Sequence, residues 1–110
     1  MSEENLQLLP GTLYMLILRT LSAGPLHGYA ISRRIRQCSA EVLDVEEGSL
    51  YPALNRMLVK GWLKAKWGTS DTGRKARFYQ LTNEGRKQLA SEASDFDTLV
   101  AAIQQVMRTA

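Results

Sequence analysis

Basic side chains are concentrated in one part of this 110-residue chain, and their placement suggests what the chain can bind. Residues 48–88 hold nine Lys and Arg residues and two acids, a net charge of +7, whereas the whole chain carries +3. The rest of the chain is therefore acidic overall. Basic charge gathered in one segment is the pattern expected of a protein that binds a polyanion. The alternative interpretation is an ordinary solvated surface of Lys and Arg.

Four polar residues in this segment share one face of a predicted helix. Apolar residues recur at positions i, i+3, i+4, i+7 and i+8 from Leu50, which predicts an amphipathic helix over residues 48–60. The polar residues on the opposite face are Ser49, Tyr51, Asn55 and Arg56. Asn can pair with adenine and Arg with guanine, whereas Ser and Tyr hydroxyl groups more often contact phosphates. We expect base contacts from Asn55 and Arg56, with Ser49 and Tyr51 setting the register.

Further cations follow in a predicted β-hairpin. Residues 62–68 and 74–82 have the alternating and aromatic character of strands, and residues 69–73 are rich in turn formers. The cations along this hairpin are Lys64, Lys66, Arg74, Lys75 and Arg77. Such side chains can flank the phosphate backbone of double-stranded DNA or enter its minor groove. Solubilising surface charge is the alternative.

Catalytic and metal-binding chemistry is not indicated. The chain has one Cys and one His, too few for a four-ligand zinc site, and Cys38 cannot form an internal disulfide. Nucleophile, phosphate-loop and metalloprotease motifs are absent from the sequence. We therefore expect neither an enzyme nor a cofactor or metal. His27 and Tyr29 are interpreted as residues that hold the second helix against its neighbours or touch a phosphate, and Cys38 as a small filler, with a redox role as the alternative.

The elements around the basic segment predict a winged helix-turn-helix, a mainly α fold with a small β-hairpin. Apolar spacing predicts a first helix over residues 12–22 and a second that begins near Leu26. Residues 39–47 are expected to form a loop with room for one brief strand. Pro52 is tolerated in the first turn of a helix, so the third helix should begin close to Ser49. Three helices followed by a basic hairpin give this fold.

The last helix carries a second apolar stripe. Its seam residues are separated by four, three, four, three and four positions, and Leu99 and Val106 widen the stripe. The seam consists of Leu89, Ala93, Phe96, Val100, Ile103 and Met107. A terminal helix with such a stripe needs a partner, so we expect residues 83–110 to dimerise and residues 1–82 to form the DNA-binding domain. The alternative is that the helix folds back on its own domain.

Three blocks of sequence resemble the PadR family of bacterial transcriptional regulators, its short-tailed branch in particular. They are LPGTLYMLILRTLSAGPLHGYAISRRI, EEGSLYPALNRMLVKGWL and GRKARFYQLTNEGRKQL, which lie between residues 9 and 89 of the chain. The resemblance implies a dimeric winged-helix repressor that binds an inverted-repeat operator and leaves it when an effector or another signal intervenes. It also implies that the third helix is the recognition element and the hairpin is the wing.

Aromatic residues raise the question of an effector. Some members of the family sense flat hydrophobic compounds between their subunits, which makes a small aromatic effector a candidate partner here. Phe96 lies in the seam, and the flanking Asp95 and Asp97 would favour a cationic aromatic ligand. Trp62 and Trp67 are expected instead to pack the hairpin onto the helical core.

The sequence thus predicts a cytoplasmic homodimer that binds double-stranded DNA. The longest apolar stretch, residues 13–18, falls well short of the roughly 18–20 residues that a membrane-spanning helix needs. The N-terminus lacks the basic and apolar segments of a secretory signal. An alternative function is a winged-helix module that binds protein and has no sequence-specific affinity for DNA.

Overall fold

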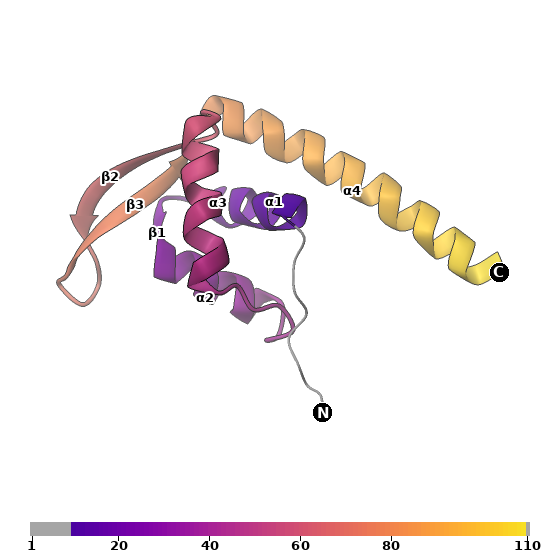
Figure 1. The fold of residues 1–110 in the computed structure, drawn as a ribbon, viewed down its shortest axis with the longest axis horizontal. Coiled ribbons are helices and arrows are strands. Elements are labelled where there is room, and N and C mark those ends of the chain that lie inside the picture. The colour runs from indigo at the N-terminus through magenta and orange to yellow at the C-terminus, as the bar shows by residue number, and fades with distance from the viewer. Residues whose placement is uncertain (1–9, 110) are drawn as a thin grey trace.

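The computed structural model describes residues 10–109, which form four helices and a three-stranded sheet (Figure 1). In chain order the elements are α1 (Pro10–Leu21), β1 (Leu26–His27), α2 (Gly28–Cys38), α3 (Glu47–Val59), β2 (Leu63–Thr69), β3 (Lys75–Leu81) and α4 (Asn83–Thr109). The hairpin of β2 and β3 extends to one side of the helices, and α4 extends away on the other side. This arrangement confirms the predicted winged helix-turn-helix with a long last helix.

The hydrophobic core lies where α1, α2 and α3 meet the base of the sheet. Seven large side chains in it are almost fully buried: Ile17, Leu18, Leu21, Ile31, Leu50, Leu54 and Met57. Burying one aliphatic side chain of this size contributes about 1.5–3 kcal/mol to stability. Three of the seven come from α3, so its apolar stripe faces inward as predicted and its polar face is left outside.

The second helix begins later than its sequence indicates. Leu26 and His27 form β1, an edge strand that pairs antiparallel with Tyr79 and Phe78 of β3, and α2 starts at Gly28. The expected start near Leu26 was therefore wrong. The cause is tertiary pairing, because a strand of two residues has no periodicity of its own to detect.

The third helix begins earlier than expected. It starts at Glu47, which places Pro52 inside the helix beyond its first turn. Proline removes the N–H that would bond to the carbonyl group of Gly48. Both residues are exposed, so water can replace the missing donor. The expectation that a helix tolerates proline only in its first turn was therefore too strict for α3.

The segment that joins α2 to α3 is a loop with one isolated bridge residue, Leu43, in place of a brief strand. Ala40 and Glu41 both have positive φ angles, 52° and 67°. This left-handed pair turns the chain sharply between the two helices.

The hairpin has a continuous register that sorts its side chains between two faces. Leu63 pairs with Leu81, Ala65 with Tyr79, and Trp67 with Arg77. Because side chains alternate along a strand, these pairs and Lys75 share the face that meets the helices. Lys64, Lys66 and Phe78 belong to the opposite face. At the tip, the N–H groups of Ser70 and Gly73 donate to the carbonyl groups of Arg74 and Ser70, and Gly73 has a φ of 83°.

Thr82 and Gly85 attach α4 to the winged-helix unit. The Thr82 hydroxyl group donates to the Gly61 carbonyl oxygen over 2.6 Å and accepts from the Gly85 N–H over 3.0 Å. Gly85 is buried against the backbone of Trp62. The first turn of α4 is therefore anchored where α3 ends and β2 begins.

Among residues 10–109, no helix is long and apolar enough to cross a membrane. The absence of a secretory signal was inferred in part from residues 1–9, which lie outside the described residues.

Candidate nucleic-acid interface

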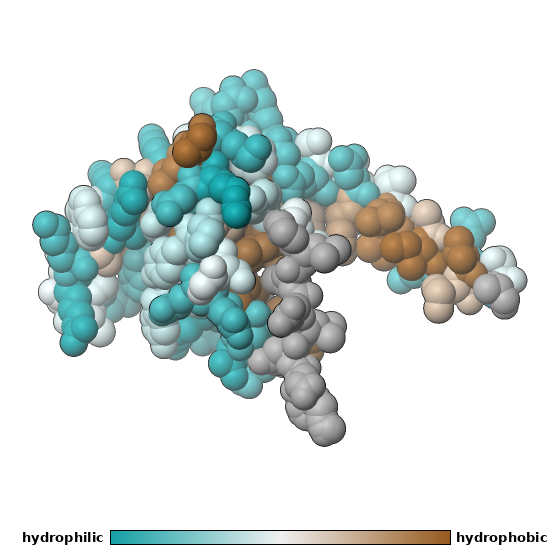
Figure 2. Space-filling model, in the orientation of Figure 1, coloured by the Kyte–Doolittle hydropathy of each residue, from teal (hydrophilic) through white to brown (hydrophobic). Residues whose placement is uncertain are grey.

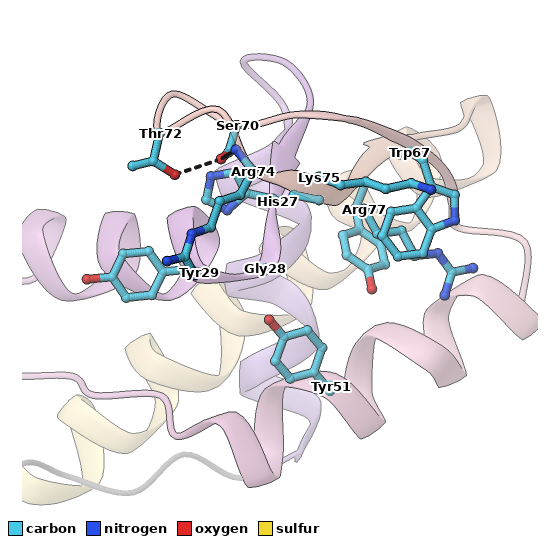
Figure 3. A pocket seen from close by; sticks show the side chains of 12 residues that line it. His27, Gly28, Tyr29, Tyr51, Trp67, Ser70, Thr72, Arg74, Lys75 and Arg77 are labelled. Atoms are coloured by element: carbon cyan, nitrogen blue, oxygen red, sulfur yellow. Dashed lines mark hydrogen bonds between the residues drawn. The ribbon is translucent and has the colours of Figure 1, made fainter.

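A groove of about 770 Å³ separates the hairpin from the first turns of α2 and α3 (Figure 3). The helices contribute Tyr29 and Tyr51, and the hairpin contributes Trp67 and three cations. The full lining is His27, Gly28, Tyr29, Tyr51, Trp67, Ser70, Thr72, Arg74, Lys75, Ala76, Arg77 and Tyr79. None of these described lining residues is acidic. The groove is therefore suited to an anionic ligand with planar or apolar groups.

Tyr51 brings the third helix into the groove. Its hydroxyl group points toward the backbone of Gly28, which leaves just enough space because glycine has no side chain. Partial burial raises the pKa of the Tyr51 phenol above its ordinary value of 10.0, and Glu47 and Tyr79 raise it further. The phenol is thus neutral at physiological pH and can donate a hydrogen bond to an anion.

The other three polar residues predicted on α3 are exposed but do not line the groove. Ser49 and Asn55 are open to solvent, on the side of α3 away from the core. Arg56 lies on the flank toward α1, where its guanidinium group is 3.4 Å from the hydroxyl oxygen of Tyr14 and donates to it. The structure therefore brings Tyr51 together with the hairpin and sets Arg56 apart from it.

The five hairpin cations are divided between two faces. Arg74, Lys75 and Arg77 line the groove. Lys64 and Lys66 lie on the opposite face, beside a separate hollow of about 210 Å³ that includes Phe78. The sequence suggested a single basic wing, whereas the strand alternation gives it two basic faces.

The two cations on the groove face of β3 lie over aromatic rings. The ammonium nitrogen of Lys75 is 5.4 Å from the ring centroid of Trp67, and the guanidinium carbon of Arg77 is 5.8 Å from that of Tyr79. Both distances fall within the range of cation–π attraction. These contacts place each cation beside an aromatic ring on the groove face.

The two tryptophans differ in their environments. Trp62 is partly buried against the core and meets the Tyr14 ring edge-on at 6.0 Å, as its predicted packing role requires. Trp67 is 62% exposed in the groove, so the prediction that it packs onto the helical core was wrong. It lies too far along the hairpin for the helices to cover it.

His27 has a structural role. Its Nδ1 atom accepts a hydrogen bond from the N–H of Ala30 over 3.2 Å and so caps α2, and its ring meets Phe78 edge-on at 5.4 Å. No cluster of three or more metal-ligating side chains occurs within residues 10–109. Cys38 is exposed at the end of α2, beside Arg34 and Ser39 in a shallow hollow.

Comparison with known proteins decides the family. Residues 17–91 match the model of the transcriptional regulator PadR-like family, which is more than half of the chain. The chain belongs to this family. The family part of the resemblance seen in the sequence is thereby confirmed, and membership of a regulator family agrees with the expectation of a non-enzymatic protein.

Solved structures of transcriptional regulators share this fold over most of the chain. A transcriptional regulator from Clostridium thermocellum is 28% identical, with a TM-score of 0.79 over 86% of this chain and 92% of that one. A PadR family transcription regulator from Clostridium difficile is 27% identical, with a TM-score of 0.76 over 86% and 97%.

A curated relative is much longer than this chain. An uncharacterized 37.1 kDa protein in a transposon of Streptomyces fradiae is 43% identical over 79 residues, which is 72% of this chain and 21% of that protein. The chain therefore spans about one fifth of the length of this relative.

The predicted seam of this PadR-like chain is partly covered near its start and open further along. Leu89 packs against the core, whereas Phe96, Ile103 and Met107 are exposed. Ala93 and Val100 are intermediate. Figure 2 shows the apolar surface gathered along the outer part of α4. Packing of α4 against its own domain therefore covers the seam only in the first turns of the helix.

Gly28 is a site residue that the sequence did not indicate, whereas Tyr29, interpreted as a packing or phosphate-contacting residue, does line the groove. The signal for Gly28 was its position directly before a tyrosine at a helix start, because a glycine there allows another element to approach closely. Gly28 is uncharged, so a search for cations could not find it.

Proposed function

We propose that this chain is a dimeric, sequence-specific DNA-binding repressor that recognises an inverted-repeat operator and leaves it when a small molecule or another signal intervenes. The observation that carries the proposal is the groove beside α3. It gathers Arg74, Lys75 and Arg77 on one face, and none of its described lining residues is acidic. A recognition helix next to a basic hairpin fits a duplex, whose major groove is about 12 Å wide and accepts one helix.

The proposed contacts divide between α3 and the wing. Asn55 and Arg56 read bases at the exposed side of α3, and Ser49 and Tyr51 fix its register through phosphates. The wing cations hold the phosphate backbone: Lys64, Lys66, Arg74, Lys75 and Arg77. Because Lys64 and Lys66 occupy the far face, they would contact different phosphates from Lys75 and Arg77.

The proposed dimer follows from the uncovered part of α4. Residues 1–82 would form the DNA-binding unit and residues 83–110 the dimerisation helix. Pairing through the exposed seam would place two copies of α3 on two half-sites, which is the arrangement that an inverted repeat requires. Such a regulator would act in the cytoplasm.

A candidate effector site lies between α1 and α4. A hollow of about 340 Å³ there is lined by Met15, Phe96 and Leu99 together with the acids Glu92 and Asp95. Apolar and aromatic walls beside carboxylates fit a small aromatic cation. Asp97, the second acid predicted to attract such a ligand, is exposed and is not part of the lining.

The test is fluorescence-anisotropy titration of the purified protein with duplex DNA from its own upstream region and with a scrambled duplex, at two salt concentrations. We expect preferential, salt-sensitive binding to the upstream duplex. Binding that ignores sequence, or no binding at all, would favour the protein-interaction module.

Two variants separate the proposed roles. Lys75→Ala should weaken binding to both duplexes and lower the slope of log K against log salt by about one unit, because one phosphate contact is lost. Arg56→Ala should lose about 1–3 kcal/mol of discrimination between the duplexes. Equal losses on both duplexes for both variants would contradict this division.

A further inference from the structure

Trp67 lies on the groove face of the hairpin, beyond the reach of the hydrophobic core. Its strand register places it on the same face as Leu63, which is 3% exposed, yet Trp67 itself is 62% exposed. Large aromatic side chains usually contribute to stability by burial. Core packing therefore does not account for an indole in this position.

Two cations lie beside this indole. The ammonium nitrogen of Lys75 lies 5.4 Å from the ring centroid, and Arg77 is the residue directly opposite Trp67 across the hairpin. Figure 3 shows the three side chains side by side on the strands, facing a groove whose other wall carries Tyr29 and Tyr51. The surface thus alternates positive charge with an exposed aromatic ring.

This alternation restricts the chemistry of the partner. An apolar protein surface laid on Trp67 would remove water from Lys75 and Arg77 without pairing their charges, which is costly. A simple anion would leave the indole in water. The backbone of a DNA duplex instead alternates charged phosphates with apolar sugars, and the base edges lie beside the sugars.

We propose that Trp67 is a direct DNA contact of the wing: its indole lies against deoxyribose rings and base edges while Lys75 and Arg77 take adjacent phosphates. The inference rests on the proposed DNA-binding function. It adds a contact that depends on apolar burial and not on charge.

Tryptophan fluorescence tests the contact directly, because the chain has only two tryptophans. Trp62→Phe leaves Trp67 as the sole tryptophan, and Trp67→Phe leaves the core-packed Trp62 as the matched control. Upon saturation with the upstream duplex, we expect Trp67 emission to be quenched and shielded from acrylamide, and Trp62 emission to stay unchanged. An unresponsive Trp67 on saturated DNA would overturn the inference.

Labelling the unaltered chain with 5-fluorotryptophan provides a second measurement if Trp62→Phe weakens the fold. The fluorine spectrum has one resonance per tryptophan, and Trp67→Phe assigns them. Only the Trp67 resonance should shift when the duplex is added. A shift confined to Trp62 would contradict the proposal.

The affinity of Trp67 variants for the duplex distinguishes a direct DNA contact from a role in positioning Lys75. Trp67→Ala should weaken binding about tenfold, or about 1.4 kcal/mol, with an unchanged salt slope. If Trp67 acted only by orienting Lys75, Trp67→Ala would lower the salt slope as Lys75→Ala does. The double variant would then bind DNA no more weakly than Lys75→Ala alone. Absence of any duplex binding by the unaltered protein would overturn the proposed function itself, whereas binding without a Trp67 response overturns this inference alone.

Discussion

Gly28 sets how closely α2 approaches the Tyr51 ring in the groove. A Cβ atom at Gly28 would lie 2.6 Å from the Tyr51 hydroxyl oxygen and 2.8 Å from two ring carbons, closer than real atoms come. We therefore expect Gly28→Ala to displace the Tyr51 ring from the groove. If Tyr51 donates to a phosphate, the variant should weaken duplex binding by about 1.5 kcal/mol, the value of a hydrogen bond to a charged group.

The control for Gly28 is the same substitution in a Tyr51→Ala background. The added methyl group then meets no ring, so Gly28→Ala should have little further effect on the anisotropy titration. Equal losses in both backgrounds would show that Gly28 acts through another part of α2. Circular dichroism checks that each variant retains its helices.

The residues of the groove differ in how far the sequence predicts them. The cations Arg74, Lys75 and Arg77 were predicted by charge alone, because charge is visible in composition. Trp67 was misassigned because an aromatic residue in a strand is usually buried, and burial depends on where along the hairpin the helices end. Gly28 was missed because its contribution is the space that it leaves free.

At the scale of elements, Gly85 determines how α4 joins the winged-helix unit. A Cβ atom there would clash with the backbone carbonyl oxygen of Trp62, which already accepts from the N–H of Thr82. The backbone of Trp62 cannot move aside as the end of a flexible side chain can. We expect Gly85→Ala to lower the free energy of unfolding by about 1–3 kcal/mol, the usual cost of overpacking.

Gly48→Ala is the matched control for Gly85→Ala in urea unfolding. Gly48 also lies in the first turn of a helix, but it is exposed, and apart from its chain neighbours and the backbone of its own helix no described atom lies within 4 Å of the added Cβ. Alanine there should raise stability by about 0.5–1 kcal/mol because it loses less backbone entropy on folding. A loss of stability at Gly48 equal to that at Gly85 would contradict the steric explanation.

Elements with a repeating pattern were predictable, and those made by distant pairing were not. The spacing of Leu50, Leu54 and Met57 predicted the buried face of α3, because those residues lie on one stripe in any helix. The strand at Leu26 and His27 exists because β3, some fifty residues later, offers its edge. Local periodicity contains no trace of such a contact.

At the scale of the whole molecule, α4 extends apolar surface into solvent on the side away from the groove (Figure 1, Figure 2). Leu99 is 57% exposed and Met107 73% exposed. Contiguous apolar surface of this kind marks an interface in soluble proteins. A second copy of α4 is the proposed cover, because the seam has the heptad spacing that pairs helices.

Ile103→Asp tests the proposed assembly, since it places a carboxylate in the middle of the seam. Burying that charge without a partner is too costly for a dimer, so the variant should sediment as a monomer. Gln105→Asp adds the same charge to the same exposed helix outside the seam and should leave the dimer mass unchanged. The monomer retains its groove, so it should still bind a single half-site weakly while losing the cooperative binding to an inverted repeat. A dimer of unchanged mass for Ile103→Asp would place the interface elsewhere, and unchanged operator affinity in a monomer would show that one copy of α3 is sufficient.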